Sequence, residues 1–594
     1  MTDAAAALLG GETAVGERSS GDKRPPGDER PPGPVEGSRL TRLDILVATG
    51  LIVLIVVVPA VLAIHAGAFS IPYADDWSYR KIAFDFYRTG SVQFTGWVSM
   101  TLVGLLAWAW PFIAIFGHHE WVLSFASSVL AAVAVVFAYL LSRLLLSVWW
   151  SVAAVAVMAS FAGFLWNTSA FMTDIPAMAG ITACLWLGIT AFNRQGSSYL
   201  ALVTASMVAG LFGFSIREFA VFAPVAVLAG LAYFERRRAV RLGAIGVVVL
   251  IGCGVLYEWS THVSGYELRN PGPFTVKSLI VVPWLYFSTC LFISPAIILA
   301  AARARKRFGE LSVMGGIGVA VVGVMLLLLG KGVFLGDFLT QQGILGGSLR
   351  GGRPDLLPGI VWGALELLAI LAGALLVALV LATSNPALPK VATPPSRTSM
   401  ARLTLWVFVV TSAPLVAIFA VFHFAEDRYV WPIALVSAIL LLDWYTREVA
   451  GGDRAIDRPG PVVAALVLAL LLLMNAVLTL NAYSYLVGVW DSGMAAAARG
   501  IPATKIDAGF QWVGTHATTR AYLTRTPHLN STEGRYDAYF PRFVECAVVT
   551  QRPMHPKGMT LAQVRHYKEY GIFGSANLYL YVTSGSCGQT KSGG

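Results

Sequence analysis

The chain has 594 residues, of which 56% are hydrophobic and 13% are charged. Soluble domains carry about 25% charged residues, so this composition excludes an ordinary soluble protein and indicates many membrane-spanning helices. The formal net charge of +10 does not point to an anionic partner, because the basic residues cluster in short loops between apolar runs, a pattern that orients membrane spans. No nucleic-acid partner is expected.

The first 41 residues differ in kind from the rest of the chain. They are rich in Pro, Gly and mixed charge and lack the apolar residues needed to form a core. We expect residues 1–41 to form a disordered cytoplasmic tail. The apolar run 45–67 that follows is long enough to cross a bilayer, and its position after such a tail favours an uncleaved anchor over a signal peptide.

Successive apolar runs from residue 45 to residue 483 predict the membrane topology. The basic clusters 236–241 and 303–307, together with Arg143, should face the cytoplasm. All of them do so only if one run does not cross, and the run 97–117 is the best exception because it is broken by glycine and proline and is rich in tryptophan. We predict an all-α polytopic membrane protein with about thirteen transmembrane helices, an interfacial or re-entrant segment and a cytoplasmic N-terminus.

The acidic motifs share the external face in this topology. Asp75 and Asp76, in YADDWSY, follow the first span, and Asp174, in MTDIP, precedes a later one. Apolar residues between 79 and 87 recur at helical spacing, so a helix lying on the membrane surface should begin at the aspartate pair. An aspartate at a helix start is also an ordinary N-cap, and capping is the alternative for Asp75 and Asp174.

Basic residues accompany these carboxylates on the same face. Arg217 lies in SIRE and Arg428 in DRYVWP, where simple ion pairs with Glu218 and Asp427 are the alternative to a role in a site. A glycine-rich external loop could close over a ligand. It carries three more basic residues, for which headgroup contacts or solvation are alternatives: Lys331, Arg350 and Arg353.

The segment after the last span is less apolar and indicates a small α+β domain outside the membrane. We expect a transmembrane domain at 42–485 and this extracytoplasmic domain at 486–594, with strands near 543–549 and 578–582 around a helix at 561–570. Within it Cys546 and Cys587 form an even pair in an oxidising compartment, which favours a disulfide.

The order of these motifs resembles the GT-C superfamily of glycosyltransferases. An acidic pair after the first span, an amphipathic surface helix, an external TD before a span, a late DRYVWP and an external C-terminal domain are similar to the family of protein mannosyltransferases and lipid A aminoarabinose transferases. The likeness extends over about residues 45–445. It departs at 94–101, FTGWVSMT, where many members carry a Lys-Pro-Pro type stretch.

The resemblance implies transfer of a sugar from a polyprenyl phosphate to a glycan, lipid or protein acceptor, at the outer face of a bacterial plasma membrane and in contact with membrane lipids. Such a donor has a good leaving group, so one carboxylate base suffices, unlike glycoside hydrolysis. We expect Asp75 to be the base, with Asp76 and Asp174 orienting the acceptor or tuning that base. The expected ligands of the donor phosphate are basic residues of the external face: Arg217, Arg428, Lys331, Arg350 and Arg353.

Metal use and two rival functions stay open. His118, His119 and Glu120 could suggest a divalent ion, which some superfamily members need, but adjacent histidines lack the usual helical ligand spacing and favour a structural role. A transporter or flippase of lipid-linked sugars would share the many spans, yet no repeated halves are evident. A non-catalytic membrane protein that binds cell-wall glycans is the other alternative.

Overall fold

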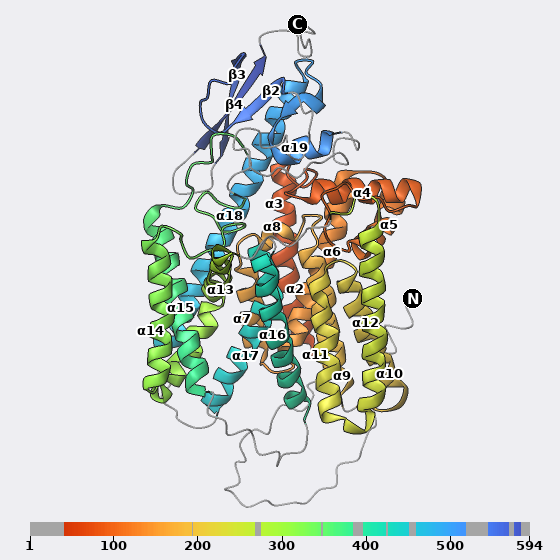
Figure 1. The fold of residues 1–594 in the computed structure, drawn as a ribbon, viewed down its shortest axis with the longest axis vertical. Coiled ribbons are helices and arrows are strands. Elements are labelled where there is room, and N and C mark those ends of the chain that lie inside the picture. Colours follow the sequence, from red (N-terminus) through yellow and green to blue (C-terminus); the bar gives the residue numbers. More distant parts are fainter. Residues whose placement is uncertain are drawn as a thin grey trace, which may run out of the picture. The chain divides into compact units, whose positions relative to one another are not determined.

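The computed structural model describes residues 41–192, 194–267, 275–345, 349–383, 396–422, 426–450, 459–517, 545–568 and 575–583. Contacts divide the chain into residues 1–41 and 42–594, and every element below belongs to the second unit. That unit consists mainly of long helices running side by side, with a small sheet near its C-terminal end (Figure 1). The predicted fold class, a polytopic helical membrane protein with a small C-terminal α+β region, is confirmed.

Eleven helices in the described residues are long and apolar enough to cross a membrane. They are Arg42–Ala66 (α2, a π-helical turn and α3), Glu120–Arg143 (α6), Asp174–Ala191 (α9), Gly196–Phe214 (α10), Arg236–His262 (a short 3-10 turn and α12), Ser278–Arg307 (mostly α13), Glu310–Leu328 (α14), Gly359–Thr383 (α15), Arg397–Phe422 (α16), Asp427–Ala450 (a 3-10 turn and α17) and Pro459–Ala497 (α18).

Two of the shorter apolar helices account for the difference from about thirteen predicted spans. They are Val148–Ala159 (α7) and Glu218–Phe234, which contains a 3-10 turn and α11 (Phe222–Phe234). A third, Val103–Phe116 (α5), lies in the run predicted not to cross. The apolar run at 148–166 is interrupted after Ala159, and a separate turn of helix, Phe164–Asn167 (α8), follows it. The runs predicted from hydropathy are therefore helical, but two of them are shorter than a typical crossing.

Helix α5 begins and ends at the same end of the bundle. At its start the Gly104 amide donates to the Ser215 carbonyl at 2.9 Å. Just after its end the His118 ring lies 3.8 Å, centroid to centroid, from Phe84 of helix α4 (Asp76–Thr89). Figure 1 shows α5 beside α4 at this end. This arrangement agrees with the prediction that the run 97–117 does not cross.

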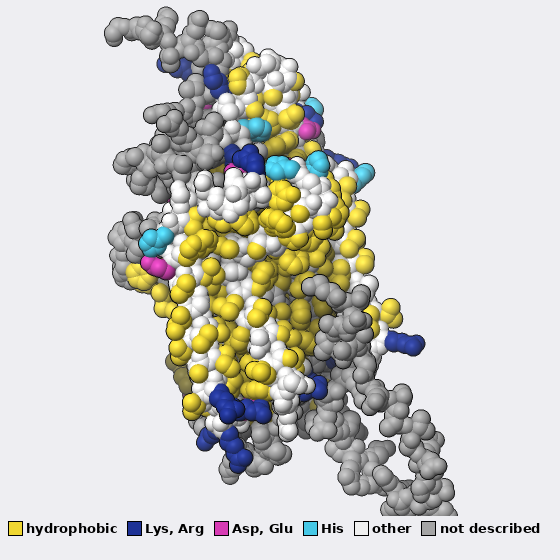
Figure 2. Space-filling model, turned by 90° about the vertical axis from the view of Figure 1, so that its right-hand side faces the viewer, with side chains coloured by type: hydrophobic (Ala, Val, Ile, Leu, Met, Phe, Trp, Pro, Cys, Tyr) yellow, Lys and Arg dark blue, Asp and Glu magenta, His cyan; other side chains and the backbone are white. Residues whose placement is uncertain are grey.

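The opposite helix ends are joined by ion pairs. Arg143 at the end of α6 donates to Asp44 of α2 (Arg42–Ile52) at 2.7 Å, and Arg402 of α16 binds Asp443 of α17 (Trp431–Ala450) at 2.8 Å. Figure 2 shows a hydrophobic flank with Lys and Arg side chains at its lower end and further Lys and Arg side chains above it. An apolar flank between polar ends is the arrangement expected of a protein that spans a membrane.

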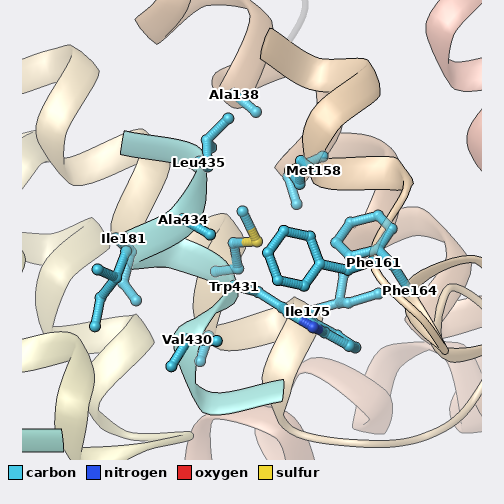
Figure 3. Close-up of a cluster of buried hydrophobic side chains, with 14 of the residues drawn as sticks. Ala138, Met158, Phe161, Phe164, Ile175, Ile181, Val430, Trp431, Ala434 and Leu435 are labelled. Atoms are coloured by element: carbon cyan, nitrogen blue, oxygen red, sulfur yellow. The ribbon is translucent and has the colours of Figure 1, made fainter. Parts of the chain in front are cut away.

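A buried hydrophobic cluster fixes the starts of α9 and α17. The rings of Trp431 and Phe164 lie 5.2 Å apart, edge to face, with Ile175 and Val430 buried in the same core. Figure 3 shows these side chains pointing toward one another from different helices. Because Ile175 and Trp431 lie close in sequence to polar residues of the external motifs, this packing sets where those polar side chains emerge.

The C-terminal sheet packs on an extension of α18. Its strands are β1 (Ile506–Asp507), β2 (Ala547–Thr550), β3 (Met559–Lys568) and β4 (Ser575–Thr583), in the order β1-β2-β4-β3, with helix α19 (Gly509–His516) after β1. Strands β1 and β2 are parallel, whereas β2 and β3 both run antiparallel to β4. The predicted domain boundary at residue 485 falls inside α18 (Pro459–Ala497), which therefore continues into the core of the sheet region.

The predicted helix at 561–570 is wrong. Residues 559–568 form β3, paired along their length with β4 from Met559 opposite Thr583 to Lys568 opposite Ser575. Leu561, Val564 and Tyr567 have a spacing that suits a helix, but a register shift at Leu561 interrupts the strict alternation that would have marked a strand. The strands predicted near 543–549 and 578–582 are present as β2 and β4 with shifted bounds.

The cysteines that the structure describes differ in bonding state. Cys184, Cys253 and Cys290 are buried and free. Cys546 is disulfide-bonded. Cys587 lies outside the described residues, so its pairing with Cys546 stays a prediction.

Candidate functional site

Asp75 occupies the N-cap position of α4 without capping it. Its side chain makes no cap hydrogen bond. Instead, Oδ1 accepts a hydrogen bond from Trp97 Nε1 at 3.0 Å, and Oδ2 lies 3.3 Å from Nη2 of Arg428. The side chain is 22% exposed. The carboxylate is thus oriented by two donors and remains accessible, which a capping role would not require.

Asp174 lies in the first turn of α9 and also makes no cap bond. Its Oδ1 is 3.3 Å from Arg217 Nη2, and its Oδ2 is 3.3 Å from Arg428 Nε. The preceding residue, Thr173, accepts a hydrogen bond from Arg217 Nε at 2.7 Å. Asp174 is buried, and its two oxygens are each faced by a guanidinium. It therefore holds the two arginines in place.

Arg428 connects the carboxylates of this cluster. Besides Asp75 and Asp174, it forms an ion pair with Glu426, and its guanidinium lies over the Phe338 ring, 5.1 Å from the centroid. The side chain is buried. We call Asp75, Asp174, Arg217, Arg428 and Glu426 the carboxylate–arginine cluster.

The simple ion pairs considered from the sequence are replaced by other contacts. Glu218 accepts a hydrogen bond from the Thr101 amide at 2.7 Å rather than pairing with Arg217. Asp427 accepts from the amides of Phe338 and Leu339 at 2.9 and 3.0 Å. Glu218 and Asp427 thus bind backbone segments next to the cluster. Arg217 and Arg428 therefore remain able to pair with Asp174 and Asp75.

Asp76 is bonded differently from its neighbour Asp75. It is fully buried, and its Oδ2 accepts from the Arg80 guanidinium at 3.1 Å and from the Phe171 amide at 3.1 Å. Arg80 also donates to Glu120 and Ser124 of α6. Burial raises the pKa of Asp76 to about 6, although the Arg80 charge acts in the opposite direction. These contacts join α4, α6 and the loop before α9, and so hold Asp75 in place through the backbone.

Two further carboxyl groups lie close to the cluster. Burial raises the pKa of Glu426, while the charge of Arg428 opposes that shift. Burial, followed by the charges of Glu426 and Asp427, raises the pKa of Asp337 well above its ordinary range. The site therefore gathers more acidic groups than its arginines can neutralise, and some of them are held in the protonated form more readily than usual.

The remaining predicted phosphate ligands occupy different positions. Lys331 is exposed. Arg350 pairs with Asp507 and Glu545, and its carbonyl accepts from the Gln551 amide, so it fastens the loop to the C-terminal sheet. Arg353 is buried against Tyr485. The loop from 331 to 358 thus does not present all three side chains in one place.

The possible metal ligands near the site are not arranged to bind a divalent metal ion. His118 packs on Phe84, and Glu120 pairs with Arg80 at 3.3 Å, so neither converges on the carboxylate–arginine cluster. Each oxygen of Asp174 faces a guanidinium, which places positive charge where a cation would bind. In the part of the chain that the structure describes, His, Cys, Asp and Glu form no group of three suited to a metal.

Helix α19 of the C-terminal region lies on α4 beside Asp75. Phe510 of α19 packs on Trp97 at 4.8 Å and on Trp77 at 5.7 Å between ring centroids. A Cβ at Gly514 would lie 2.3 Å from the Trp77 ring, so the contact depends on that glycine. Lys81 adds a hydrogen bond to the Ala517 carbonyl at 2.7 Å. The C-terminal region therefore supplies aromatic surface next to the candidate base.

The sequence analysis missed several residues of the site. Trp97, Thr173 and Glu426 were not singled out as contacts, although each lies within or beside a motif that was. Their polarity within otherwise apolar surroundings was the available signal. Which partners they meet depends on the packing of helices distant in sequence, which a local sequence pattern does not specify.

Comparison with known proteins gives one family and two solved structures. Residues 104–259 match the family model described as "Dolichyl-phosphate-mannose-protein mannosyltransferase". This match confirms the predicted resemblance to protein mannosyltransferases over the segment that contains Asp174 and Arg217. It does not extend to Asp75 or Arg428. A search of curated protein sequences finds no significant match.

The two structures are of ArnT from Cupriavidus metallidurans. The form bound to undecaprenyl phosphate is 12% identical in sequence, with a TM-score of 0.37, over 91% of this chain and 99% of that chain. The apo form is 14% identical, with a TM-score of 0.33, over 90% of this chain and 98% of that chain.

Proposed function

We propose that this protein is an integral membrane glycosyltransferase that moves a sugar from a polyprenyl phosphate to an acceptor hydroxyl, with inversion at the anomeric carbon. The observation that carries the proposal is the placement of Asp75, a partly exposed carboxylate oriented by Trp97 and Arg428 within a buried ionic cluster. The family match, whose description names a dolichyl-phosphate-mannose-dependent transferase, supports a lipid-phosphate donor.

Asp75 is the proposed general base. As the acceptor oxygen attacks the anomeric carbon, its proton passes to Asp75, a new bond forms between that oxygen and the carbon, and the bond from the carbon to the phosphate oxygen breaks. The sugar leaves the lipid, which departs as polyprenyl phosphate. Because phosphate is already a good leaving group, no second carboxylic acid is required. Asp174 contributes by fixing Arg217 and Arg428.

The proposed site faces the extracytoplasmic side of a bacterial plasma membrane. The ends of the helices opposite to the carboxylate–arginine cluster carry the basic loops, including Arg143 and the 3-10 turn Arg236–Arg238. Basic loops favour the cytoplasmic side, which supports an external site, a cytoplasmic N-terminus and an extracytoplasmic C-terminal domain. A glycan, lipid or protein acceptor would then reach Asp75 from outside.

Transfer by the purified full-length protein tests the proposal. The protein is reconstituted with labelled polyprenyl-phosphate mannose as a hexosyl donor and polyprenyl-phosphate arabinose as a pentosyl donor, together with a membrane extract as acceptor source. We expect one donor to be consumed by the wild type and not by Asp75→Asn. If the wild type consumes neither donor but moves either across the bilayer, it is a flippase; binding without movement or transfer would indicate a glycan-binding protein.

A further inference from the structure

Arg353 is a buried cation that no polar group of the described residues pairs with. It lies in the loop between α14 and α15 and is 3% exposed. Among the described residues, none accepts a hydrogen bond from Nε, Nη1 or Nη2 of its guanidinium. The guanidinium lies over the Tyr485 ring, whose centroid is 4.2 Å from Cζ.

This arrangement differs from that of the other buried arginines. Arg80, Arg217 and Arg428 each face at least one carboxylate. A guanidinium does not lose its proton in a protein, so burial without a partner is not relieved by neutralisation. A ring face compensates only part of the lost hydration. The side chains that the structure describes therefore leave the hydrogen-bonding capacity of Arg353 unused.

A second polar side chain without a hydrogen-bond partner in the described residues lies near Arg353. Asn481 of α18 is fully buried, and in the described structure neither its amide nitrogen nor its oxygen has a hydrogen-bond partner. A Cβ at Gly343 would lie 3.3 Å from Arg353 Nη1 and 3.5 Å from Asn481 Nδ2. The backbone at Gly343, with φ of 103°, therefore lies close to both side chains. Tyr485 stands one helical turn beyond Asn481 on α18.

Two of the arginines predicted to bind the donor phosphate, Arg217 and Arg428, already face carboxylates of the protein. Arg217 faces Asp174, and Arg428 faces Asp75, Asp174 and Glu426. The loop that carries Arg353 also supplies Phe338, which packs under Arg428. The unpaired guanidinium and the carboxylate–arginine cluster are therefore connected through one loop.

We propose that Arg353 and Asn481 form the site that binds a phosphate group. The guanidinium supplies a fork of donors that matches two phosphate oxygens, and the Asn481 amide supplies a further donor. The identification of this group as the phosphate of a polyprenyl phosphate rests on the proposed function. Free phosphate or a phospholipid headgroup carries the same chemistry, and the experiment separates these sources.

Ligand-induced stabilisation of the full-length protein tests the site without requiring catalysis. Thermal unfolding in detergent is measured for wild type, Arg353→Gln, Arg353→Lys and Asn481→Leu, with polyprenyl phosphate, polyprenol, inorganic phosphate or phosphatidylglycerol. Arg237→Gln is the control, because it removes a charge from an exposed position in the basic turn Arg236–Arg238, at the end of the helices opposite to the carboxylate–arginine cluster. A Kd for each ligand follows from the concentration dependence.

Without ligand, Arg353→Gln should unfold at the wild-type temperature or above it, because the variant removes an uncompensated buried charge. Polyprenyl phosphate should stabilise the wild type and Arg237→Gln, whereas polyprenol should not. The Kd should rise at least tenfold in Arg353→Gln and Asn481→Leu, with Arg353→Lys intermediate. An equal shift with inorganic phosphate or with phosphatidylglycerol would support the site and identify that source instead.

Two results would overturn the proposal. One is unchanged polyprenyl phosphate affinity in Arg353→Gln and Asn481→Leu. The other is a lower unfolding temperature of Arg353→Gln without ligand, which would show that Arg353 is structural. Failure of the proposed function gives a different pattern, in which the wild type binds polyprenyl phosphate through Arg353 but transfers sugar from no donor.

Discussion

Arg428, at the start of the α17 segment, contacts Asp174 at the start of α9, with Nε 3.3 Å from Oδ2. The same guanidinium reaches Asp75 on α4, so one side chain joins three segments that lie far apart in the sequence. The buried cluster of Trp431, Phe164 and Ile175 beside it fixes the two helix starts. A shift of either helix would therefore move the candidate base relative to its donors.

Replacing Asp75 by asparagine should remove transfer and leave the fold intact. Asp75 makes no cap bond and is partly exposed, so its charge contributes little to stability. Loss of a general base typically lowers the rate by about a hundredfold to ten-thousandfold. Turnover of the labelled donor and the unfolding temperature are the two measurements.

Asp85→Asn is the matched control for that experiment. Asp85 lies on the same helix, and its pair with Arg88 is exposed, so its loss should affect neither activity nor stability appreciably. Equal activity of Asp75→Asn and Asp85→Asn would remove Asp75 as the base.

Trp97→Phe should reduce activity only by loosening the orientation of the Asp75 carboxylate. The change deletes the indole donor to Asp75 Oδ1 but keeps an aromatic ring beside Phe510. One hydrogen bond is worth about 0.5–1.5 kcal/mol, or up to about tenfold in rate. Trp108→Phe is the control, since it deletes an equivalent indole bond, to the Ala126 carbonyl at 3.0 Å. A similar loss of kcat in both variants would argue against an effect on Asp75.

The sequence predicted that the charged residues of the site lie at the same end of the helices, but it did not predict which of them form ion pairs. Treating the run 97–117 as non-crossing brings Asp75, Asp174, Arg217 and Arg428 to one end, and the structure joins all four in one cluster. The side of the membrane on which a loop lies depends only on the number of spans that precede it, and hydropathy predicts that number well. The ion-pair partners were harder to predict from the sequence. Whether Arg217 pairs with Asp174 or with Glu218 depends on how closely α9 approaches it.

The C-terminal region shows where pattern reasoning fails. Residues 559–568 contain apolar residues at helix-like spacing but form a strand because β4 offers a full row of hydrogen-bonding partners. For Arg350 the role of phosphate ligand stays a prediction, and its ion pairs in the structure are with Asp507 and Glu545. The strand at 559–568 and these ion pairs both depend on contacts made after the chain folds back, which local sequence does not specify.

Arg428→Gln should destabilise the protein as well as inactivate it. The change leaves the buried carboxylate of Asp174 without one of its two guanidinium partners and removes the pair with Glu426. Removing one partner of a buried ion pair costs about 3–5 kcal/mol. Unfolding of the reconstituted protein in a denaturing detergent measures this loss. Arg402→Gln is the control, because its pair with Asp443 lies at the basic end and Arg402 is 30% exposed. An equal loss in both variants would contradict a special role of Arg428 in holding the cluster.

The pH dependence of stability should report Asp76. The pKa of this carboxyl is raised by burial to about 6, above its ordinary value of 3.8. Between these values the folded state binds more protons than the unfolded state, so the contribution of Asp76 to stability falls as pH rises from about 4 to about 6 and is constant above that range.

The comparison of wild type with Asp76→Asn isolates this effect, because asparagine does not titrate while Asp337 and Glu426 remain in both proteins. The stability of wild type minus that of the variant should decline across the window. A difference that is flat, or that increases with pH, would contradict a raised pKa for Asp76.

Thiol labelling of intact cells should show which end of the helices faces outward. Lys331 and Arg237 are both exposed, but Lys331 lies in the loop that meets the carboxylate–arginine cluster and Arg237 in the basic turn at the opposite end. Cys184, Cys253 and Cys290 are buried, and Cys546 is disulfide-bonded, which keeps the background from these residues low. Because basic loops stay in the cytoplasm, a membrane-impermeant maleimide should label Lys331→Cys in intact cells and Arg237→Cys only after permeabilisation. The reverse pattern would place Asp75 on the cytoplasmic side, where an extracytoplasmic acceptor could not reach it, and would exclude the proposed reaction at the outer face.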